Sequence, residues 1–321
     1  MALKNKTLFL PLLFACFSCV ENLILIQIHP DKQTYIKFQS TGDSLDIFDN
    51  DFTHPKVSGD WISNYRQIND SDNNWSHITE GYFKESEYIF TDSGQSHLGY
   101  KYKNNIIKSF LSRHYEFHLT FSGTKIKTEF PDLYKAIISK NLDSLKWLPE
   151  ALTVLMQKSL NDIDSESISP EKRLWNKRLV NHLRNSFAKM SNENTLSIIQ
   201  NNRIKFLKEL LKPFNVNDTL TLKLAESMVV HEKVLRSRID LQDDTFLVKL
   251  LMPGQIVSAN ATNMIDDTLI WNFGIDSLLD DNYVLIASST LYTIERLEIV
   301  LILIGIILFL LVSYGIKRKR L

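Results

Sequence analysis

The segment Arg113–Phe121, which reads RHYEFHLTF, alternates strictly between polar and apolar side chains. Its apolar members are Tyr115, Phe117, Leu119 and Phe121. A period of two residues is that of a β-strand with one buried face. The segment therefore predicts a strand in a sheet that covers a hydrophobic core with one of its sides.

The opposite face of this strand carries His114, Glu116 and His118. Two imidazoles and one carboxylate on one face are side chains that bind transition metals. The spacing is not that of the helical H-E-x-x-H motif, and a solvated polar strand face gives the same pattern. We expect neither a metal nor another cofactor, and we keep these three residues as the candidate ligands if a metal binds.

Further strands are expected before this segment. Leu23–Ile28 and Tyr35–Phe38 flank a His-Pro-Asp-Lys turn, and this arrangement predicts a β-hairpin. Short aromatic runs at Tyr82–Phe83 and Tyr88–Phe90 also predict strands. The stretch 49–75 is rich in Asp, Asn, Ser, His and Pro, so we expect it to be irregular.

Helical spacing replaces the alternation after the central strand. Leucines within Leu142–Met156 recur at three- and four-residue steps, with a predicted kink at Pro149. Ser169-Pro170-Glu171 has the composition of a helix N-terminus, and a further helix is expected over Leu196–Lys212. Asn217–Arg238 is ambiguous, because its leucines first alternate and its later apolar residues follow helical spacing.

Extended segments return near the end of the chain, at Phe246–Met252, Gln255–Ala259, Thr268–Phe273 and Tyr283–Ala287. Strands on both sides of a helical middle predict one discontinuous β-domain. The predicted fold class is therefore α+β, with an antiparallel β-rich extracytoplasmic domain over 19–129 and 241–293. A helical insertion or subdomain over 130–240 interrupts this domain, and a C-terminal transmembrane helix follows it.

The N-terminal segment 1–18 has the features of a signal peptide. Lys4 and Lys6 precede an apolar run of 12 residues, which is shorter than the about 20 residues that a membrane span needs. The chain has two cysteines, Cys16 and Cys19, and both lie where signal processing occurs. Leu13–Cys16 resembles a bacterial lipobox, but Cys19 lies directly before the first strand, so we favour lipid attachment at Cys19 over Cys16. Cleavage without lipid attachment remains an alternative.

The C-terminal end predicts a membrane anchor. Ile299–Ile316 contains 18 residues without a charge, which as a helix extend over about 27 Å. Lys317, Arg318, Lys319 and Arg320 follow at once, and positive charges favour the cytoplasmic side. We therefore predict a transmembrane helix over 297–316, a basic cytoplasmic tail over 317–321, and an exported domain on the periplasmic or extracellular side.

Charge is distributed unevenly along the chain. The formal net charge is +0, but without the six basic residues of the two ends the exported part has 31 basic and 37 acidic residues. This acidic balance argues against a nucleic acid as partner. Residues 171–212, in contrast, carry ten Lys or Arg against three Glu. This stretch is either a surface for anionic headgroups or the solvated back of helices that pack on the sheet.

Two blocks of the chain partly resemble a known family of proteins. The first strand leads into Pro30-Asp31, and far downstream come Leu251–Asn260 and Thr268–Trp271, followed by the lone membrane helix with its basic tail. This order resembles the LppM-type bacterial membrane-anchored lipoproteins, although Ala261 stands where that pattern often has Gly. The resemblance implies a periplasmic domain that interacts with lipid or the envelope and is not an enzyme.

These patterns together predict a function without catalysis. The sequence has no G-x-S-x-G, P-loop or G-x-G-x-x-G motif. We expect a lipidated, membrane-anchored envelope protein that binds lipid, glycolipid or another envelope component through its exported domain. The alternatives are a structural or assembly partner of other membrane proteins, and a hydrolase whose site one sequence does not reveal.

Overall fold

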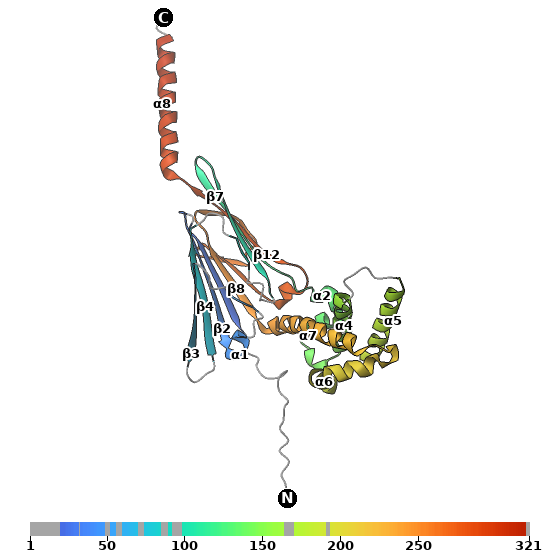
Figure 1. Cartoon of the computed structure of the whole chain (residues 1–321). Helices are drawn as coiled ribbons and strands as arrows, with labels where there is room; N and C mark the ends of the chain where they lie inside the picture. The colour runs from blue at the N-terminus through green and yellow to red at the C-terminus, as the bar shows by residue number, and fades with distance from the viewer. Residues whose placement is uncertain are drawn as a thin grey trace.

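The structure of the protein is a computed structural model that describes residues 20–31, 33–48, 52–55, 60–69, 74–84, 89–91, 98–163, 170–190 and 193–318. It contains two β-sheets, a group of helices that follows the first seven strands, and a long C-terminal helix (Figure 1). The predicted α+β fold class is confirmed.

The larger sheet has seven strands in the order β10-β11-β8-β1-β2-β4-β3. These strands are β1 (Glu21–Ile28), β2 (Thr34–Asp43), β3 (Trp61–Asn69), β4 (Asn74–Phe83), β8 (Thr245–Leu251), β10 (Asn263–Ile265) and β11 (Thr268–Gly274). The predicted hairpin is confirmed, since β2 pairs antiparallel with β1 along the whole of β1.

The sheet is mixed, because β1 and β8 run parallel from the pair Glu21 and Thr245 onwards. The predicted antiparallel arrangement is therefore wrong for this central pair. Parallel neighbours need a long crossover connection, and here the whole chain between Ile28 and Thr245 provides it. The nearly continuous apolar sequences of β1 and β8 are typical of such central strands.

The smaller sheet has five antiparallel strands in the order β5-β6-β7-β12-β9. They are β5 (Ile89–Thr91), β6 (Tyr100–Lys108), β7 (Ser112–Phe121), β9 (Gln255–Ala259) and β12 (Tyr283–Tyr292). The strand predicted from RHYEFHLTF is confirmed as β7, and its four apolar side chains are fully buried. The strand β6 was not expected, although its start, YKYK, has the same alternation.

Aromatic side chains from both sheets form the core between them. Phe121 of β7 lies 5.9 Å from Phe246 of β8 and 5.2 Å from Phe273 of β11, measured between ring centroids. Nearer the other end of β7, the rings of Phe117 and Trp271 are 5.9 Å apart. The inner faces of the two sheets are therefore in direct contact through large apolar groups, which supply most of the favourable free energy of folding.

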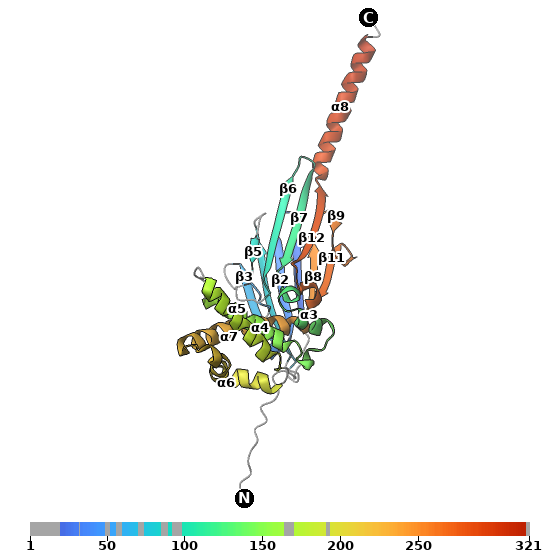
Figure 2. The ribbon, with the colours of Figure 1, turned by 90° about the vertical axis from the view of Figure 1, so that its right-hand side faces the viewer.

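Helices fill the segment between β7 and β8. These are α2 (Ile126–Glu129), α3 (Pro131–Ile138), α4 (Leu148–Ile163), α5 (Pro170–Phe187), α6 (Glu193–Leu211) and α7 (Asp218–Asp240). We call α3–α7 the helical unit. It lies at the end of the sheets opposite to α8 (Ile294–Arg318), as both ribbon views show (Figures 1 and 2).

The helical unit confirms two predicted helices and corrects one detail. The helix expected to start at Ser169–Glu171 is α5. The helix expected over Leu196–Lys212 is α6, which ends at Leu211 and is kinked at Asn202, where φ is −140° and ψ is 44°. The kink predicted at Pro149 is wrong, because α4 begins at Leu148. In the first turn of a helix, proline removes an N–H that has no partner within the helix, so it starts α4 without bending it.

The ambiguous segment after Pro213 is one helix. Asn217 precedes α7, and its side chain accepts a hydrogen bond from the backbone N–H of Leu220 at 2.8 Å. This contact is an N-cap, which satisfies a donor that the first turn leaves without a partner. The cap and the later helical spacing therefore outweigh the short alternation at the start of the helix.

The prediction of irregular structure over 49–75 is wrong for β3 and for the start of β4. Most side chains of β3 are exposed, because the strand lies at the edge of the sheet and pairs only with β4. Backbone hydrogen bonds to one neighbour hold such a strand, so it needs few of the apolar residues by which strands are recognised.

Candidate functional site

The three candidate metal ligands lie on the outer face of β7, but they do not form a metal site. His114 Nε2 is 3.9 Å from Glu116 Oε1, and His114 Nδ1 is 3.1 Å from Thr290 Oγ1. Glu116 Oε2 also accepts a hydrogen bond from Asn105 at 3.1 Å. Within the described residues, no three His, Cys, Asp or Glu side chains are grouped so that they could hold a metal, and His118 does not complete such a group.

The predicted processing and topology residues lie at the ends of the chain. The signal segment 1–18, Cys16 and Cys19 are outside the described residues, as are Lys319 and Arg320. Lys317 and Arg318 form the last turn of α8. Lipid attachment and the orientation of the tail therefore stay predictions.

The helix α8 contains 25 residues and includes the predicted transmembrane segment. Its large apolar side chains at Ile299, 301–304 and 306–311 are between 47% and 72% exposed. Among the residues that the structure describes, no helix combines the length and the apolar character that crossing a membrane requires.

The residues that carry the resemblance have structural roles. Gly254 has φ +82°, and a Cβ atom there would lie 2.3 Å from the carbonyl oxygen of Thr290, so only glycine fits this turn. The side chain of Asn260 accepts hydrogen bonds from Trp271 Nε1 at 3.0 Å and from the backbone of Ile286 at 2.8 Å. Asn260 thereby joins β11 of the larger sheet to β12 of the smaller one.

A chain of hydrogen-bonded side chains, which we call the His54 network, lies on the inner face of the larger sheet where β2 leads into α1 (Ser44–Ile47). The Nε2 atom of buried His54 is 2.9 Å from Ser40 Oγ, and its Nδ1 is 3.0 Å from Thr79 Oγ1. Ser40 donates to Asn22 Oδ1 at 2.5 Å, and Asn22 donates to Asp244 at 2.9 Å. The network therefore links β1, β2, β4 and the residue before β8.

These hydrogen bonds define the protonation state of His54. Ser40 has one hydroxyl proton and donates it to Asn22, so its oxygen accepts from His54 Nε2. A neutral imidazole has a proton on one nitrogen only, here Nε2, while Nδ1 lies 3.0 Å from Thr79 Oγ1, whose own proton is donated to Ser63 Oγ at 3.1 Å. Burial lowers the pKa of His54 well below its usual value, and the neighbouring His77 lowers this pKa further, so the ring is neutral.

A stack of three rings connects the network to the surface. The ring of His77 is parallel to that of His54 at 3.9 Å and to that of Tyr65 at 4.1 Å, between centroids. Its Nε2 lies 2.9 Å from Ser63 Oγ, and burial lowers the pKa of His77 to about 4. Tyr65 is 53% exposed, so the stack extends from solvent to the buried His54.

The pair of Ser40 and His54 resembles a nucleophile and its general base. However, a serine activated by a base donates its proton to that base, whereas Ser40 donates its proton to Asn22. Ser40 is also only 6% exposed. This geometry supports a buried polar connection between strands. Sequence analysis missed it, although Ser40 is a polar residue at an inward position after Ile36 and Phe38.

The His54 network predicts that acid weakens the fold. In the unfolded chain both histidines titrate near pH 6.5, whereas burial lowers both pKa values in the folded protein. As the pH falls from about 6.5 to about 4, the unfolded state therefore takes up protons first. For His77 we expect a loss of the free energy of unfolding on the order of 2 kcal/mol over this range, after allowance for its partial exposure, and His54 contributes in the same direction.

Urea unfolding at a series of pH values measures this loss. A variant with His54→Gln and His77→Gln lacks both titrating rings, so its stability should depend less on pH over the same range. If the variant and the original protein lose equal free energy between pH 6.5 and 4, other groups cause the effect and the assignment is wrong.

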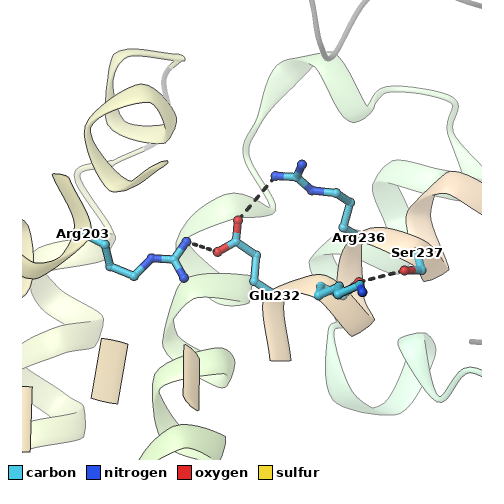
Figure 3. Close-up of polar contacts among 5 residues, drawn as sticks. Arg203, Glu232, Arg236 and Ser237 are labelled. Atoms are coloured by element: carbon cyan, nitrogen blue, oxygen red, sulfur yellow. Dashed lines mark hydrogen bonds and ion pairs between the residues drawn. The ribbon is translucent and has the colours of Figure 1, made fainter. Parts of the chain in front are cut away.

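An ion pair connects α6 and α7 of the helical unit. Glu232 of α7 pairs with Arg203 of α6 and, at 3.5 Å, with Arg236 one turn further along α7 (Figure 3). The pairing places an acid against one member of the basic stretch 171–212, and Arg203 is largely buried there. Other basic side chains of this stretch are exposed: Lys177, Arg178, Arg184, Lys189, Lys205, Lys208 and Lys212.

Comparison with known proteins finds no match to the chain among protein-family models, curated proteins or solved structures. The resemblance in Leu251–Asn260 and Thr268–Trp271 therefore stays a prediction from the residues themselves.

Proposed function

We propose that the protein is anchored in a membrane by α8 and that its sheets and helical unit form a non-catalytic binding domain outside the cytoplasm. The main observation in support of this proposal is the exposure of eleven large apolar side chains along α8, from Ile299 to Leu311. Contact of these side chains with water is unfavourable by on the order of 20 kcal/mol in total relative to an apolar environment. A bilayer provides that environment for a helix of this length.

The orientation follows from the charges at the end of α8. Lys317 and Arg318 close the helix, and two further basic residues follow in the sequence. Positive charges next to a span favour the cytoplasmic side, so the remainder of the protein lies on the outer side. In a bacterial cell, this side is the periplasm or the exterior.

The proposed anchor does not require a lipid at Cys19. β12 begins at Tyr283, and its other end leads to α8. The ring of Tyr283 is 4.5 Å from that of Phe273, and Phe273 pairs with Phe246 at the start of β8. Val20 lies beside Thr245, at this same end. The ten residues of β12 extend over about 30 Å, so Val20 is at the end of the sheets remote from α8. This separation favours cleavage without lipid attachment if the sheets stand upright on the membrane.

The helical unit is the proposed binding surface. It lies at the end of the sheets remote from α8 (Figures 1 and 2), so its exposed basic side chains are far from the membrane that α8 would span. Such a surface suits an acidic envelope protein or polymer better than the headgroups of that membrane. Contacts between aromatic rings of the two sheets favour this surface over a ligand site between the sheets.

A topology experiment tests the anchor. We expect the full chain to stay in the membrane fraction after washing with alkaline carbonate. A reporter that is active only in the cytoplasm, fused after Leu321, should be active. Release by carbonate, or activity only of a periplasmic reporter, would contradict the proposal.

Charge reversal tests the binding surface. Arg178→Glu with Arg184→Glu on α5 should reduce, several-fold, the formation of cross-linked adducts between the protein and an acidic partner in intact cells, because opposite charges bring the two surfaces together. Lys101→Glu with Lys103→Glu on β6 is the matched control, since both side chains are also exposed but lie on the smaller sheet. Equal adduct formation in both variants would reject the helical unit as the docking surface.

A further inference from the structure

The tip of the hairpin between β6 and β7 exposes apolar side chains. The backbone N–H of Ser109 donates to the carbonyl oxygen of Ser112 at 2.8 Å, which closes the turn. Ile107 is 48% exposed and Phe110 is 66% exposed. Large apolar side chains with this much exposed surface gain free energy when they move from water into an apolar environment.

This tip lies beside the first turn of α8. The backbone N–H of Thr293 donates to the carbonyl oxygen of Leu111 at 2.9 Å, and Tyr292 pairs with Ser112 across the sheet. Both ribbon views show the hairpin extending along the sheet to the base of α8 (Figures 1 and 2). Tyr292, directly before the helix, is 57% exposed.

The distance along α8 places this tip at the level of lipid headgroups. Five residues separate Ile294, where α8 begins, from Ile299, where the uncharged segment begins, and they extend over about 7.5 Å. Each headgroup layer is about 5–8 Å thick, from the difference between the whole bilayer and its hydrocarbon core. The start of α8 and the hairpin tip are then at the outer boundary of this layer.

We propose that the β6–β7 hairpin tip is a second membrane contact, in which Phe110 and Ile107 enter the headgroup layer next to α8. Aromatic residues favour this layer, and the exposed Tyr292 adds one more beside the helix. The contact would keep the sheets upright and hold the helical unit away from the membrane. This inference rests on the proposed function of α8 as the anchor.

Depth-dependent quenching tests the contact on the full chain in phosphatidylcholine–phosphatidylglycerol vesicles. In a background with Cys16→Ser and Cys19→Ser, three single variants carry an environment-sensitive fluorophore: Phe110→Cys at the tip, Leu303→Cys in α8, and Val230→Cys on α7. Val230 is the matched control, because it is 62% exposed and lies in the helical unit. Lipids with a nitroxide near the headgroup quench fluorophores that enter this layer.

We expect the label at position 110 to be quenched several-fold more than the label at 230. If the label at 303 is quenched by nitroxides deep in the acyl chains but the label at 110 behaves like that at 230, the hairpin contact is rejected and the anchor remains. If the label at 303 is not quenched either, the anchor and the contact both fail. A label at Ser109→Cys gives the same measurement should Phe110→Cys fail to fold.

Discussion

Arginine at Ile307 and Leu308 is expected to release the protein from membranes. Both residues are near the middle of the 18-residue uncharged segment, and both side chains are more than half exposed on α8. An arginine near the centre of a membrane helix costs about 2.5–3.5 kcal/mol on insertion scales, so two cost on the order of 6 kcal/mol. This cost corresponds to a shift in the insertion equilibrium of more than a thousandfold.

The measurement is the fraction of the full chain that sediments with membranes after a carbonate wash. The matched control exchanges the two residues, with Ile307→Leu and Leu308→Ile, and should behave like the original protein because it leaves the hydropathy almost unchanged. Equal sedimentation of the arginine variant and this control would show that α8 does not hold the protein in the membrane.

Sequence periodicity predicted the strands and helices whose buried side can be read from the order of their own residues. The alternation in β7 and the apolar stripe Trp175, Leu179, Leu183 and Phe187 of α5 each define one buried side. The structure buries these side chains, with Trp175 only partly buried. The N-terminus of α5 was likewise predicted from a local signal, a proline after a potential cap.

Elements that depend on distant partners could not be predicted in the same way. The parallel pair of β1 and β8 joins residues more than two hundred positions apart, and no local pattern states which strand is the neighbour. Most side chains of β3 are exposed because the strand lies at a sheet edge, and a position at the edge is a property of the assembled sheet.

The His54 network was not predicted for a related reason. Its members come from β1, β2, β4, the segment 52–55 and the residue before β8, and each is an ordinary polar residue within its own segment. Only the folded sheet brings them into hydrogen-bonding distance. The opposite holds for His114, Glu116 and His118 of β7. The sequence places these three residues on one strand face, but in the structure they form no metal-binding group.

Trp271→Ala is expected to destabilise the protein strongly, because it removes the largest fully buried side chain of the core. Trp271 is fully buried between the sheets, with its ring 5.9 Å from that of Phe117. It also donates a hydrogen bond to Asn260, which is bound in turn to β12. The substitution leaves a large cavity and removes this connection, so we expect a loss of about 3–5 kcal/mol.

The melting temperature of the full chain in detergent, followed by near-ultraviolet circular dichroism, measures this loss, and a decrease of roughly 10 °C is expected. Trp271→Phe is the informative control, because it keeps an aromatic ring against Phe117 and removes the N–H donor to Asn260. Asn260 still accepts from the backbone of Ile286, so this variant should lose only about 1–2 kcal/mol. If both variants melt within a degree of the original protein, Trp271 does not join the two sheets. If Trp271→Phe loses as much stability as Trp271→Ala, the hydrogen bond to Asn260, and not the packing of the ring, holds the sheets together.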